Sequence, residues 1–279
     1  MKNILVTGSS GYIGQHLMKM LKDIPDIKSW GLDYNPADLE PMYWDIRYDL
    51  HDYNLTMNDY PTEYDAVIHL AALVRVGESM ARPTDYYETN VNGMLNVLNG
   101  VETPNFIFAS TGAAQLPTSP YAISKRMAED LLNEYCTKLG IDYTSFRFYN
   151  VTGSDVVGPT NPDGLLFNLI SAVESKEFNI WGNDYNTKDG TCVREYVHVN
   201  DICRALIKAI DEPANSIENL AYGDTRTVKE IAEIFKEVNN VDFDIKYRGR
   251  REGDAEAYYL ENPSSYMQRN YTYEQMFKV

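Results

Sequence analysis

The fold of this chain follows from Ile4-Leu5-Val6-Thr7-Gly8-Ser9-Ser10-Gly11-Tyr12-Ile13-Gly14. An apolar run leads into three glycines at every third position, and a helical pattern follows. Glycines at this spacing let the backbone approach a pyrophosphate, and the N-terminus of the next helix supplies N–H groups and the positive end of its dipole. A glycine triplet also fits a plain tight turn, but directly after a first strand it predicts a dinucleotide site.

The same part of the chain predicts several contacts to the cofactor. Asp33 closes the second apolar run, about twenty residues beyond the helix start, where an acid can bind the ribose hydroxyls of adenosine. A carboxylate there disfavours the 2′-phosphate of NADP, so we predict NAD. The predicted contacts are Gly8, Gly11, Tyr12, Ile13, Gly14 and Asp33.

Short apolar runs alternate with helical patterns through the first half of the chain. This alternation predicts an α/β fold, a Rossmann-type doubly wound parallel sheet with helices on both faces. The expected strands are Asn3–Thr7, Lys28–Leu32, Ala66–Leu70, Asn105–Ala109 and Tyr143–Tyr149. The expected helices are Gly14–Leu21, Asp85–Asn99 and Pro120–Lys138.

The second half is less regular, and we expect it to form a smaller C-terminal α/β substrate domain. The Gly/Pro/Asp-rich stretch Thr152–Gly164 is the expected hinge. We predict an NAD-binding domain over 1–150 and a substrate domain over 151–279, with the segment near 193–212 packing back on the first. The expected elements are helices at Leu165–Glu174, Val199–Ile210 and Thr227–Asn239, and a strand at Phe178–Trp181.

Composition restricts the class of protein and its partners. The 279 residues are 44% hydrophobic and carry a net charge of -16, which argues against a nucleic-acid or anionic-membrane surface. No apolar run reaches the roughly eighteen residues that span a bilayer, and the chain opens on a strand pattern, so we expect no signal peptide. Three cysteines without CxxC spacing and four histidines without HExxH predict a cytoplasmic protein without a metal site.

Tyr121 and Lys125 form the candidate catalytic pair. They are i,i+4 within Pro120-Tyr121-Ala122-Ile123-Ser124-Lys125 and therefore share one face of a helix. A tyrosine is a useful base only if its pKa falls from about 10 towards neutrality, and a nearby ammonium favours the phenolate. A surface Tyr–Lys pair is the plain alternative, but this pair follows a strand that ends Phe108-Ala109-Ser110-Thr111, inside a dinucleotide fold.

The GxxGxxG spacing and the YxxxK pair together resemble the short-chain dehydrogenase/reductase superfamily. Thr111 stands where this superfamily usually places a catalytic serine or threonine, whose hydroxyl could hydrogen-bond the reacting sugar oxygen. The alternative is a threonine that caps the turn before Gly112.

Longer stretches resemble the UDP-glucose 4-epimerase family within that superfamily, over nearly the whole chain. They are Asp65–Ala72, Val76–Ser79, Asn90–Gly93, Trp181–Thr191 leading to Val193–Val199, and Arg250–Tyr258. The last motifs, from Trp181 onward, are specific to hexose 4-epimerases. A dehydratase relative would need an acid pair directly after Thr111, where this chain has Gly112 and Ala113.

The resemblance implies further site residues. Along the cofactor they are Asp45 and Ile46 at the adenine, Leu70, Ala71 and Ala72 at the phosphates, and Asn90, Ser110 and Phe148 near the nicotinamide half. Those that would hold UDP are Asn150, Leu165, Arg194, Arg251 and Asp254, with Asn179 and Trp181 near the uracil. Tyr258 would border the C2 substituent of the sugar, where its bulk favours glucose and galactose over N-acetylated sugars.

The resemblance also implies a reaction, the interconversion of UDP-glucose and UDP-galactose. Tyr121 would take the proton of the sugar 4-hydroxyl with the help of Thr111, while the C4 hydride passes to NAD and returns to the other face of the rotated 4-keto sugar. Lys125 would tune Tyr121 and hold the nicotinamide ribose. We expect a homodimer formed through the helices at Asp85–Asn99 and Pro120–Lys138.

The chain departs from the family pattern on the substrate side. The segments 111–121 and 150–165 are short, Gly164 replaces an asparagine, and Val74 replaces a lysine. Two rival functions stay open: an epimerase for another NDP-sugar, such as an N-acetylhexosamine or a pentose, and a weakly active regulatory protein that binds NAD and UDP. The intact Tyr121/Lys125 pair argues against the second.

Overall fold

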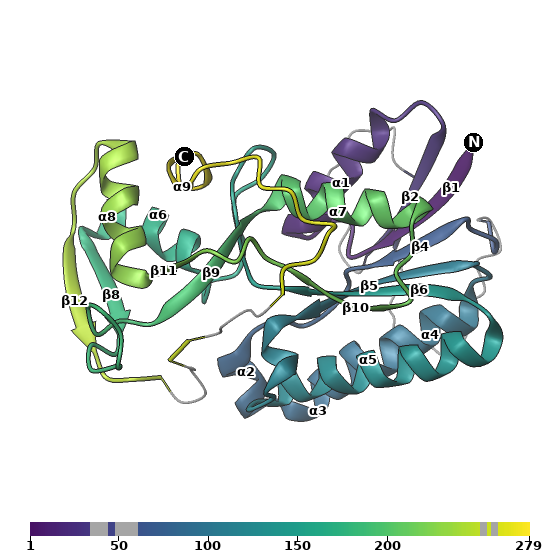
Figure 1. Ribbon diagram of the computed structural model, residues 1–279, viewed down its shortest axis with the longest axis horizontal. Coiled ribbons are helices and arrows are strands. Elements are labelled where there is room, and N and C mark those ends of the chain that lie inside the picture. The colour runs from purple at the N-terminus through teal and green to yellow at the C-terminus, as the bar shows by residue number, and fades with distance from the viewer. Residues whose placement is uncertain (34–43, 48–60, 252–255, 258–261) are drawn as a thin grey trace. The chain divides into compact units, whose positions relative to one another are not determined.

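The computed structural model describes residues 1–33, 44–47, 61–251, 256–257 and 262–279. They form two compact units, Met1–Arg147 with Cys203–Glu218, and Phe148–Ile202 with Asn219–Val279. A seven-stranded sheet falls almost entirely in the first unit, and two smaller sheets belong to the second (Figure 1). Within the described ranges, no helix is both long and apolar enough to cross a membrane.

The first unit alternates strands and helices, as predicted. Its strands are β1 (Lys2–Thr7), β2 (Ile27–Asp33), β3 (Trp44–Arg47), β4 (Ala66–His69), β5 (Asn105–Thr111), β6 (Asp142–Phe148) and β10 (Ser216–Leu220). Its helices are α1 (Tyr12–Lys22), α2 (Val76–Ala81), α3 (Pro83–Tyr87), α4 (Gly93–Gly100), α5 (Pro120–Leu139) and α7 (Val199–Asp211), which begins in the second unit.

The strand order of the large sheet is β10-β6-β5-β4-β1-β2-β3. Strands β3, β2, β1, β4 and β5 pair in parallel, and helices α4 and α5 cover one face while α1 and α7 cover the other (Figure 1). The chain runs outward from β1 in one direction through β3, and from β4 in the other. Such a reversal of strand order is where doubly wound folds bind ligands, outside the carboxyl ends of the strands. The predicted fold class is confirmed.

Strands β1, β4 and β5 are apolar on both faces because helices cover both sides of the sheet. Ile4, Leu5 and Val6 of β1 are fully buried, and so are Phe106 and Phe108 of β5. One apolar cluster joins this sheet to the inner sides of α4 and α5. The sheet is thereby a rigid platform for the loops at its carboxyl edge.

Local signals fix the start and the end of α5. The Ser119 hydroxyl accepts a hydrogen bond from the Ala122 N–H (3.3 Å), and Pro120 occupies the first turn, where its missing N–H costs nothing. Gly140 ends the helix in the left-handed region, at φ 69°. Tyr121 therefore lies in the first turn of the helix and Lys125 one turn further on.

The helix expected over Asp85–Asn99 is interrupted. It consists of α3, a π-helical turn at Glu88–Asn92, and α4. The interruption coincides with Asn90, whose side chain is buried and bonded to the backbone of Leu73 outside the helix. Helical periodicity in the sequence does not encode such a turn, which depends on a tertiary contact.

The second unit is smaller and more irregular. Its elements are β7 (Asn150–Thr152), α6 (Leu165–Ser175), β8 (Glu177–Trp181), β9 (Val193–His198), β11 (Thr225–Thr227), α8 (Val228–Asn239), β12 (Asp244–Arg248) and α9 (Tyr273–Met276). One sheet has the order β11-β9-β7 and the other pairs β12 with β8 in parallel. Its core packs α6 and α8 around Phe178, Tyr196 and Phe235.

Candidate active site

The turn between β1 and α1 is packed so closely that side chains do not fit at Gly8 and Gly14. A Cβ on Gly14 would lie 2.1 Å from the carbonyl oxygen of Gly8, and one on Gly8 would lie 2.7 Å from the backbone nitrogen of Ala71. Gly8 also has a φ of +72°, in the left-handed region that favours glycine. The turn thus brings the start of α1 against the carboxyl ends of β1 and β4.

The N-terminus of α1 has no side-chain cap, because its N-cap residue is Gly11. A helix end of this kind presents backbone N–H groups and the positive end of the dipole to an anion. Asp33, at the end of β2, accepts a hydrogen bond from the backbone N–H of Ser10 (2.9 Å). The structure therefore places the predicted ribose acid directly beside the predicted phosphate turn.

The segment after β4 is tied to the same turn. The Leu70 N–H donates to the Thr7 carbonyl (3.1 Å), and the Ala71 N–H donates to the Thr7 hydroxyl (3.3 Å). This holds the backbone of Leu70, Ala71 and Ala72 at the carboxyl end of β1, on the edge where the cofactor phosphates were predicted.

His69 is a residue of this junction that the sequence did not single out. It is fully buried, its Nδ1 lies 2.8 Å from the Thr7 hydroxyl, and its ring stacks on Phe108 with centroids 6.0 Å apart. Burial, and to a lesser extent the charge of Lys125, lowers the pKa of His69 to about 3. The imidazole is therefore neutral near pH 7, and it supports the site as a hydrogen-bonding core residue.

Lys125 is the most unusual charged group of the site. Its side chain is 2% exposed, its Nζ donates to the carbonyl oxygen of Ala109 (2.8 Å), and it lies 4.7 Å from the centre of the Phe108 ring. Burial lowers the pKa of Lys125 to about 7, against an opposing effect of Glu129. Lysines are almost never fully buried unless their charge has a partner. A buried lysine with a perturbed pKa beside a tyrosine therefore marks a candidate catalytic site.

Tyr121 is partly exposed at the start of α5. Its ring meets the ring of Tyr86 edge-on, with centroids 6.3 Å apart. Tyr86 is fully buried and its hydroxyl is bonded to the backbone of Arg75 and to Glu78. The partner ring is thus immobilised, and it restricts the orientation of the Tyr121 ring.

Thr111, the last residue of β5, acts as a cap. Its hydroxyl oxygen accepts from the Ala113 N–H (3.3 Å) at the start of a short 3₁₀ helix, Gly112–Gln115. The capping alternative raised from the sequence is therefore present. It does not exclude catalysis, because the cap uses an oxygen lone pair and not the hydroxyl hydrogen, which a substrate oxygen could accept.

Asn90 and Ser110, two predicted cofactor contacts, have buried side chains that form hydrogen bonds within the protein. The Asn90 amide accepts from the Leu73 N–H (2.8 Å) and donates to the Leu73 carbonyl (3.0 Å) and the Ser124 hydroxyl (3.0 Å). The Ser110 hydroxyl donates to Glu129 (2.5 Å). Their side-chain hydrogen bonds link α5 to the loop after β4 and to β5, and their proximity to the nicotinamide half stays a prediction.

The predicted substrate residues of the second unit form two groups. In the first, the Asn179 side chain accepts from Arg248 (2.7 Å) and the Arg251 guanidinium lies 4.5 Å from the centre of the Trp181 ring. In the second, Asn150 donates to the carbonyl of Glu195 (3.0 Å), next to Arg194 on β9. The Arg194 guanidinium donates to the Val193 and Glu256 carbonyls. Leu165 begins α6 and packs against the apolar cluster of the second unit, and Phe148 is buried at the end of β6.

Four predicted site residues lack a described side chain. Asp45 and Ile46 lie on β3, where their backbone pairs with Gly31 and Leu32. Asp254 and Tyr258 lie outside the described residues.

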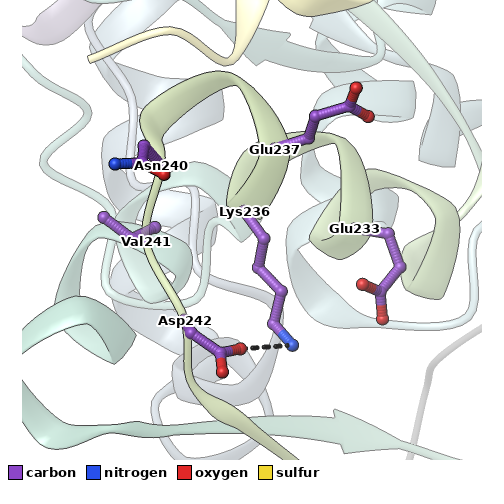
Figure 2. A pocket seen from close by; sticks show the side chains of 6 residues that line it. All are labelled: Glu233, Lys236, Glu237, Asn240, Val241 and Asp242. Carbon is purple, nitrogen blue, oxygen red and sulfur yellow. Dashed lines mark ion pairs between the residues drawn. The ribbon is translucent and has the colours of Figure 1, made fainter.

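An open pocket on the surface of α8 contains none of the predicted site residues (Figure 2). Lys236 and Asp242 form an ion pair across it, with 3.0 Å between Nζ and Oδ1. Its remaining lining residues are Glu233, Glu237, Asn240 and Val241. In the part of the chain that the structure describes, no group of three or more His, Cys, Asp and Glu residues could hold a metal ion.

The first unit fits NAD at three points: a turn with no room for a side chain at Gly8 and Gly14, a helix N-terminus without a side-chain cap, and a carboxylate beside both. A family model, the NAD dependent epimerase/dehydratase family, matches residues 4–223. The chain belongs to this family. Its cofactor is accordingly NAD, as the sequence predicted.

Individual relatives specify the type of reaction further than the family model does. The chain is 31% identical to UDP-glucose 4-epimerase of Rhizobium meliloti (strain 1021), over 91% of this chain and 87% of the relative. It is 32% identical to UDP-arabinose 4-epimerase 1 of Arabidopsis thaliana, over 92% and 72%. The crystal structure of UDP-glucose 4-epimerase from Brucella ovis in complex with NAD matches 99% of this chain and 96% of that one, with 27% identity and a TM-score of 0.88. The chain is thus a member of the NAD-dependent UDP-sugar 4-epimerases.

Proposed function

We propose that this protein interconverts UDP-glucose and UDP-galactose by inverting C4 of the sugar. The observation that carries the proposal is the buried Lys125, fixed on the Ala109 carbonyl one helical turn from the partly exposed Tyr121. A buried ammonium next to a phenol is an arrangement that stabilises the phenolate. Its place at the carboxyl edge of a dinucleotide fold makes this phenolate a base for an alcohol.

Tyr121 acts as the general base and acid at the sugar 4-hydroxyl. As a phenolate it takes the hydroxyl proton, and as a phenol it returns a proton when the alcohol forms again on the other face. NAD, when bound, supplies the redox chemistry at C4, accepting a hydride and returning it. Thr111 donates its hydroxyl hydrogen to the same sugar oxygen, while the Ala113 N–H holds the hydroxyl oxygen in place.

The positive charge of Lys125 favours the phenolate form of Tyr121, and Lys125 would hold the nicotinamide ribose. The cofactor residues of the first unit orient NAD: Gly8, Gly11, Tyr12, Ile13 and Gly14 at the phosphates, Asp33 at the adenosine ribose. In the second unit, Arg194 and Arg251 neutralise the UDP phosphates, a task that suits guanidinium because its fork binds two oxygens at once. Both local cations are needed because the chain has a net charge of -16, which repels the negatively charged phosphates at long range.

The identity of the sugar substrate has a second candidate. A pentose epimerase is among the relatives at 32% identity, so UDP-arabinose is the second candidate substrate. The sequence argument for hexoses without an N-acetyl group rests on Tyr258 beside the C2 substituent. An N-acetylated sugar would then be excluded by steric overlap.

The test is incubation of the purified protein with UDP-galactose, without added cofactor, followed by separation of the product sugars. We expect UDP-glucose to accumulate to equilibrium. UDP-arabinose and UDP-N-acetylglucosamine are run in parallel under the same conditions, and we expect kcat/KM for each to be lower than for UDP-galactose.

The possible results separate the candidates. Faster conversion of UDP-arabinose would replace the hexose by a pentose, and conversion of UDP-N-acetylglucosamine within a few-fold of UDP-galactose would remove the role of Tyr258. No conversion of any UDP-sugar, even with NAD added, would contradict catalysis and leave a regulatory protein that binds NAD.

A further inference from the structure

A buried charged cluster adjoins the catalytic helix and has no role in the reaction as proposed. Glu129 of α5 is fully buried. Arg147 of β6 binds it with two hydrogen bonds, Nε to Oε1 (2.8 Å) and Nη2 to Oε2 (2.6 Å), and the Ser110 hydroxyl donates to Oε1 (2.5 Å). Burying an ion pair is costly unless its geometry is excellent and further hydrogen bonds satisfy its polar atoms. Here the Arg147 pair is bidentate and Ser110 adds a third hydrogen bond.

The cluster fixes the position of α5 on the sheet. Lys125 and Glu129 are i,i+4 and therefore share one helix face, which packs on the end of β5. Lys125 bonds to the carbonyl of Ala109, and Glu129 bonds to the hydroxyl of the next residue, Ser110. Thr111 follows directly. Two successive contacts thus set the register between the helix that carries Tyr121 and the strand that carries Thr111.

The cluster also sets the electrostatic surroundings of Lys125. Burial lowers the pKa of Lys125 to about 7, and Glu129 acts in the opposite direction. Within the described residues, further ionisable groups near it are His69 on β4, which is neutral near pH 7 because its pKa is about 3, and Tyr121, one turn away on its own helix. Arg147 on β6 is neutralised by Glu129. Strand β5 contributes only uncharged residues, Phe108 to Thr111.

We propose that Glu129 is a positioning residue of the reaction: held by Arg147 and Ser110, it raises the ammonium fraction of Lys125 and fixes α5 against the end of β5. This role rests on the proposed function of Tyr121 and Lys125. It differs from a purely structural ion pair in one respect. The negative charge itself, and not only the packing, is required.

The first experiment compares Glu129→Gln with Glu134→Gln. Glu134 lies on the same helix, is exposed, and pairs with Lys138, so its variant is a matched control for losing one Glu charge. Glu129→Gln removes the charge that supports the Lys125 ammonium and leaves that of Arg147 behind. Both changes lower the pKa of Lys125.

Two readouts follow the effect. NMR of protein labelled with ¹³C at lysine Cε gives the titration of Lys125 directly, whether or not the protein turns over. We expect its midpoint to move to lower pH in Glu129→Gln and to stay unchanged in Glu134→Gln. A fall of about one pH unit would reduce the ammonium fraction at about pH 8, and with it kcat for UDP-galactose, roughly tenfold. KM should change little.

A double variant, Glu129→Gln with Arg147→Met, separates charge from stability. Removing both partners of a buried ion pair is far less disruptive than removing one. We expect its melting temperature to recover towards the wild type, while the Lys125 midpoint stays below the wild-type value and kcat stays low. This variant also serves if Glu129→Gln alone fails to fold.

The outcomes decide between the two roles. Recovery of kcat and of the Lys125 midpoint together with stability would overturn the proposal, because packing alone would then suffice. An unchanged Lys125 midpoint in both variants would overturn it as well. If the wild type converts no UDP-sugar, the proposed function fails, while the lysine titration still tests whether Glu129 supports the charge of Lys125.

Discussion

At the scale of single residues, Gly14 carries the sharpest constraint on the cofactor site. A Cβ there would lie 2.1 Å from the Gly8 carbonyl oxygen and 2.7 Å from that of Ser9, both backbone atoms that cannot move without changing the turn. Gly77, at the start of α2, has nothing within 4 Å of the corresponding position. The two glycines are therefore a matched pair for the same substitution.

Gly14→Ala should widen the turn and weaken NAD binding, with a loss of stability of about 1–3 kcal/mol from overpacking. Gly77→Ala should bind NAD normally and be neutral or slightly stabilising, because alanine favours a helix more than glycine does. Calorimetric titration of the stripped protein with NAD, together with thermal melts, measures both. Wild-type NAD affinity in Gly14→Ala would show that the turn does not hold the cofactor.

The residue types of the first unit's site could be predicted, but their partners could not. The Gly8–Gly14 spacing and Asp33 identified the turn, and the structure places them together. Asn90 and Ser110 have internal partners, Leu73 and Glu129. A sequence shows that a residue can donate a hydrogen bond, but the choice of acceptor depends on which segments the fold brings near. His69 was missed for the same reason.

At the scale of elements, fully buried apolar strands were predicted from the sequence, whereas several strands with polar or charged residues were not. Strands β1, β4 and β5 were predicted because burial on both faces demands near-continuous hydrophobic sequence. Strand β9, Val193–His198, was not predicted, and it places Arg194 and Glu195 side by side. The buried charge at Glu195 depends on tertiary contacts.

Glu195 illustrates this dependence on context. It is fully buried on β9, and one carboxylate oxygen accepts from the Tyr222 N–H (2.6 Å). Burial raises its pKa to about 7. The residues around Glu195 do not predict that its carboxyl group is buried, because its hydrogen-bond partner is a backbone N–H twenty-seven positions further along the chain. The strands β3, β7, β10, β11 and β12, of three to five residues each, were likewise not foreseen, although β4 and β8, which are as short, were predicted from Ala66–Leu70 and Phe178–Trp181.

At the scale of the whole molecule, charge opposes the proposed substrate. The net charge of -16 produces a long-range field that repels the phosphates of UDP, while Arg194 and Arg251 act only at short range. Salt screens long-range interactions first, over a Debye length of about 10 Å at 0.1 M. The two effects therefore separate kinetically.

Moderate salt should raise the association rate of UDP and, by weakening the Arg–phosphate contacts, also raise its dissociation rate. Stopped-flow binding of UDP at two ionic strengths measures both constants. An association rate that falls steeply with salt would mean that the field at the binding site is positive in spite of the net charge.

The central claim of this account is that Tyr121 is the proton-transferring residue of a UDP-sugar 4-epimerase. The most direct measurement is kcat for UDP-galactose in Tyr121→Phe, beside Tyr135→Phe as control. Tyr135 lies on the same helix, and its hydroxyl donates to Asn99 on α4. Both variants should fold and retain NAD.

Tyr121→Phe should lose about 10²–10⁴-fold in kcat, the usual contribution of general acid–base catalysis, and Tyr135→Phe should lose little. Near-normal turnover in Tyr121→Phe would contradict the account.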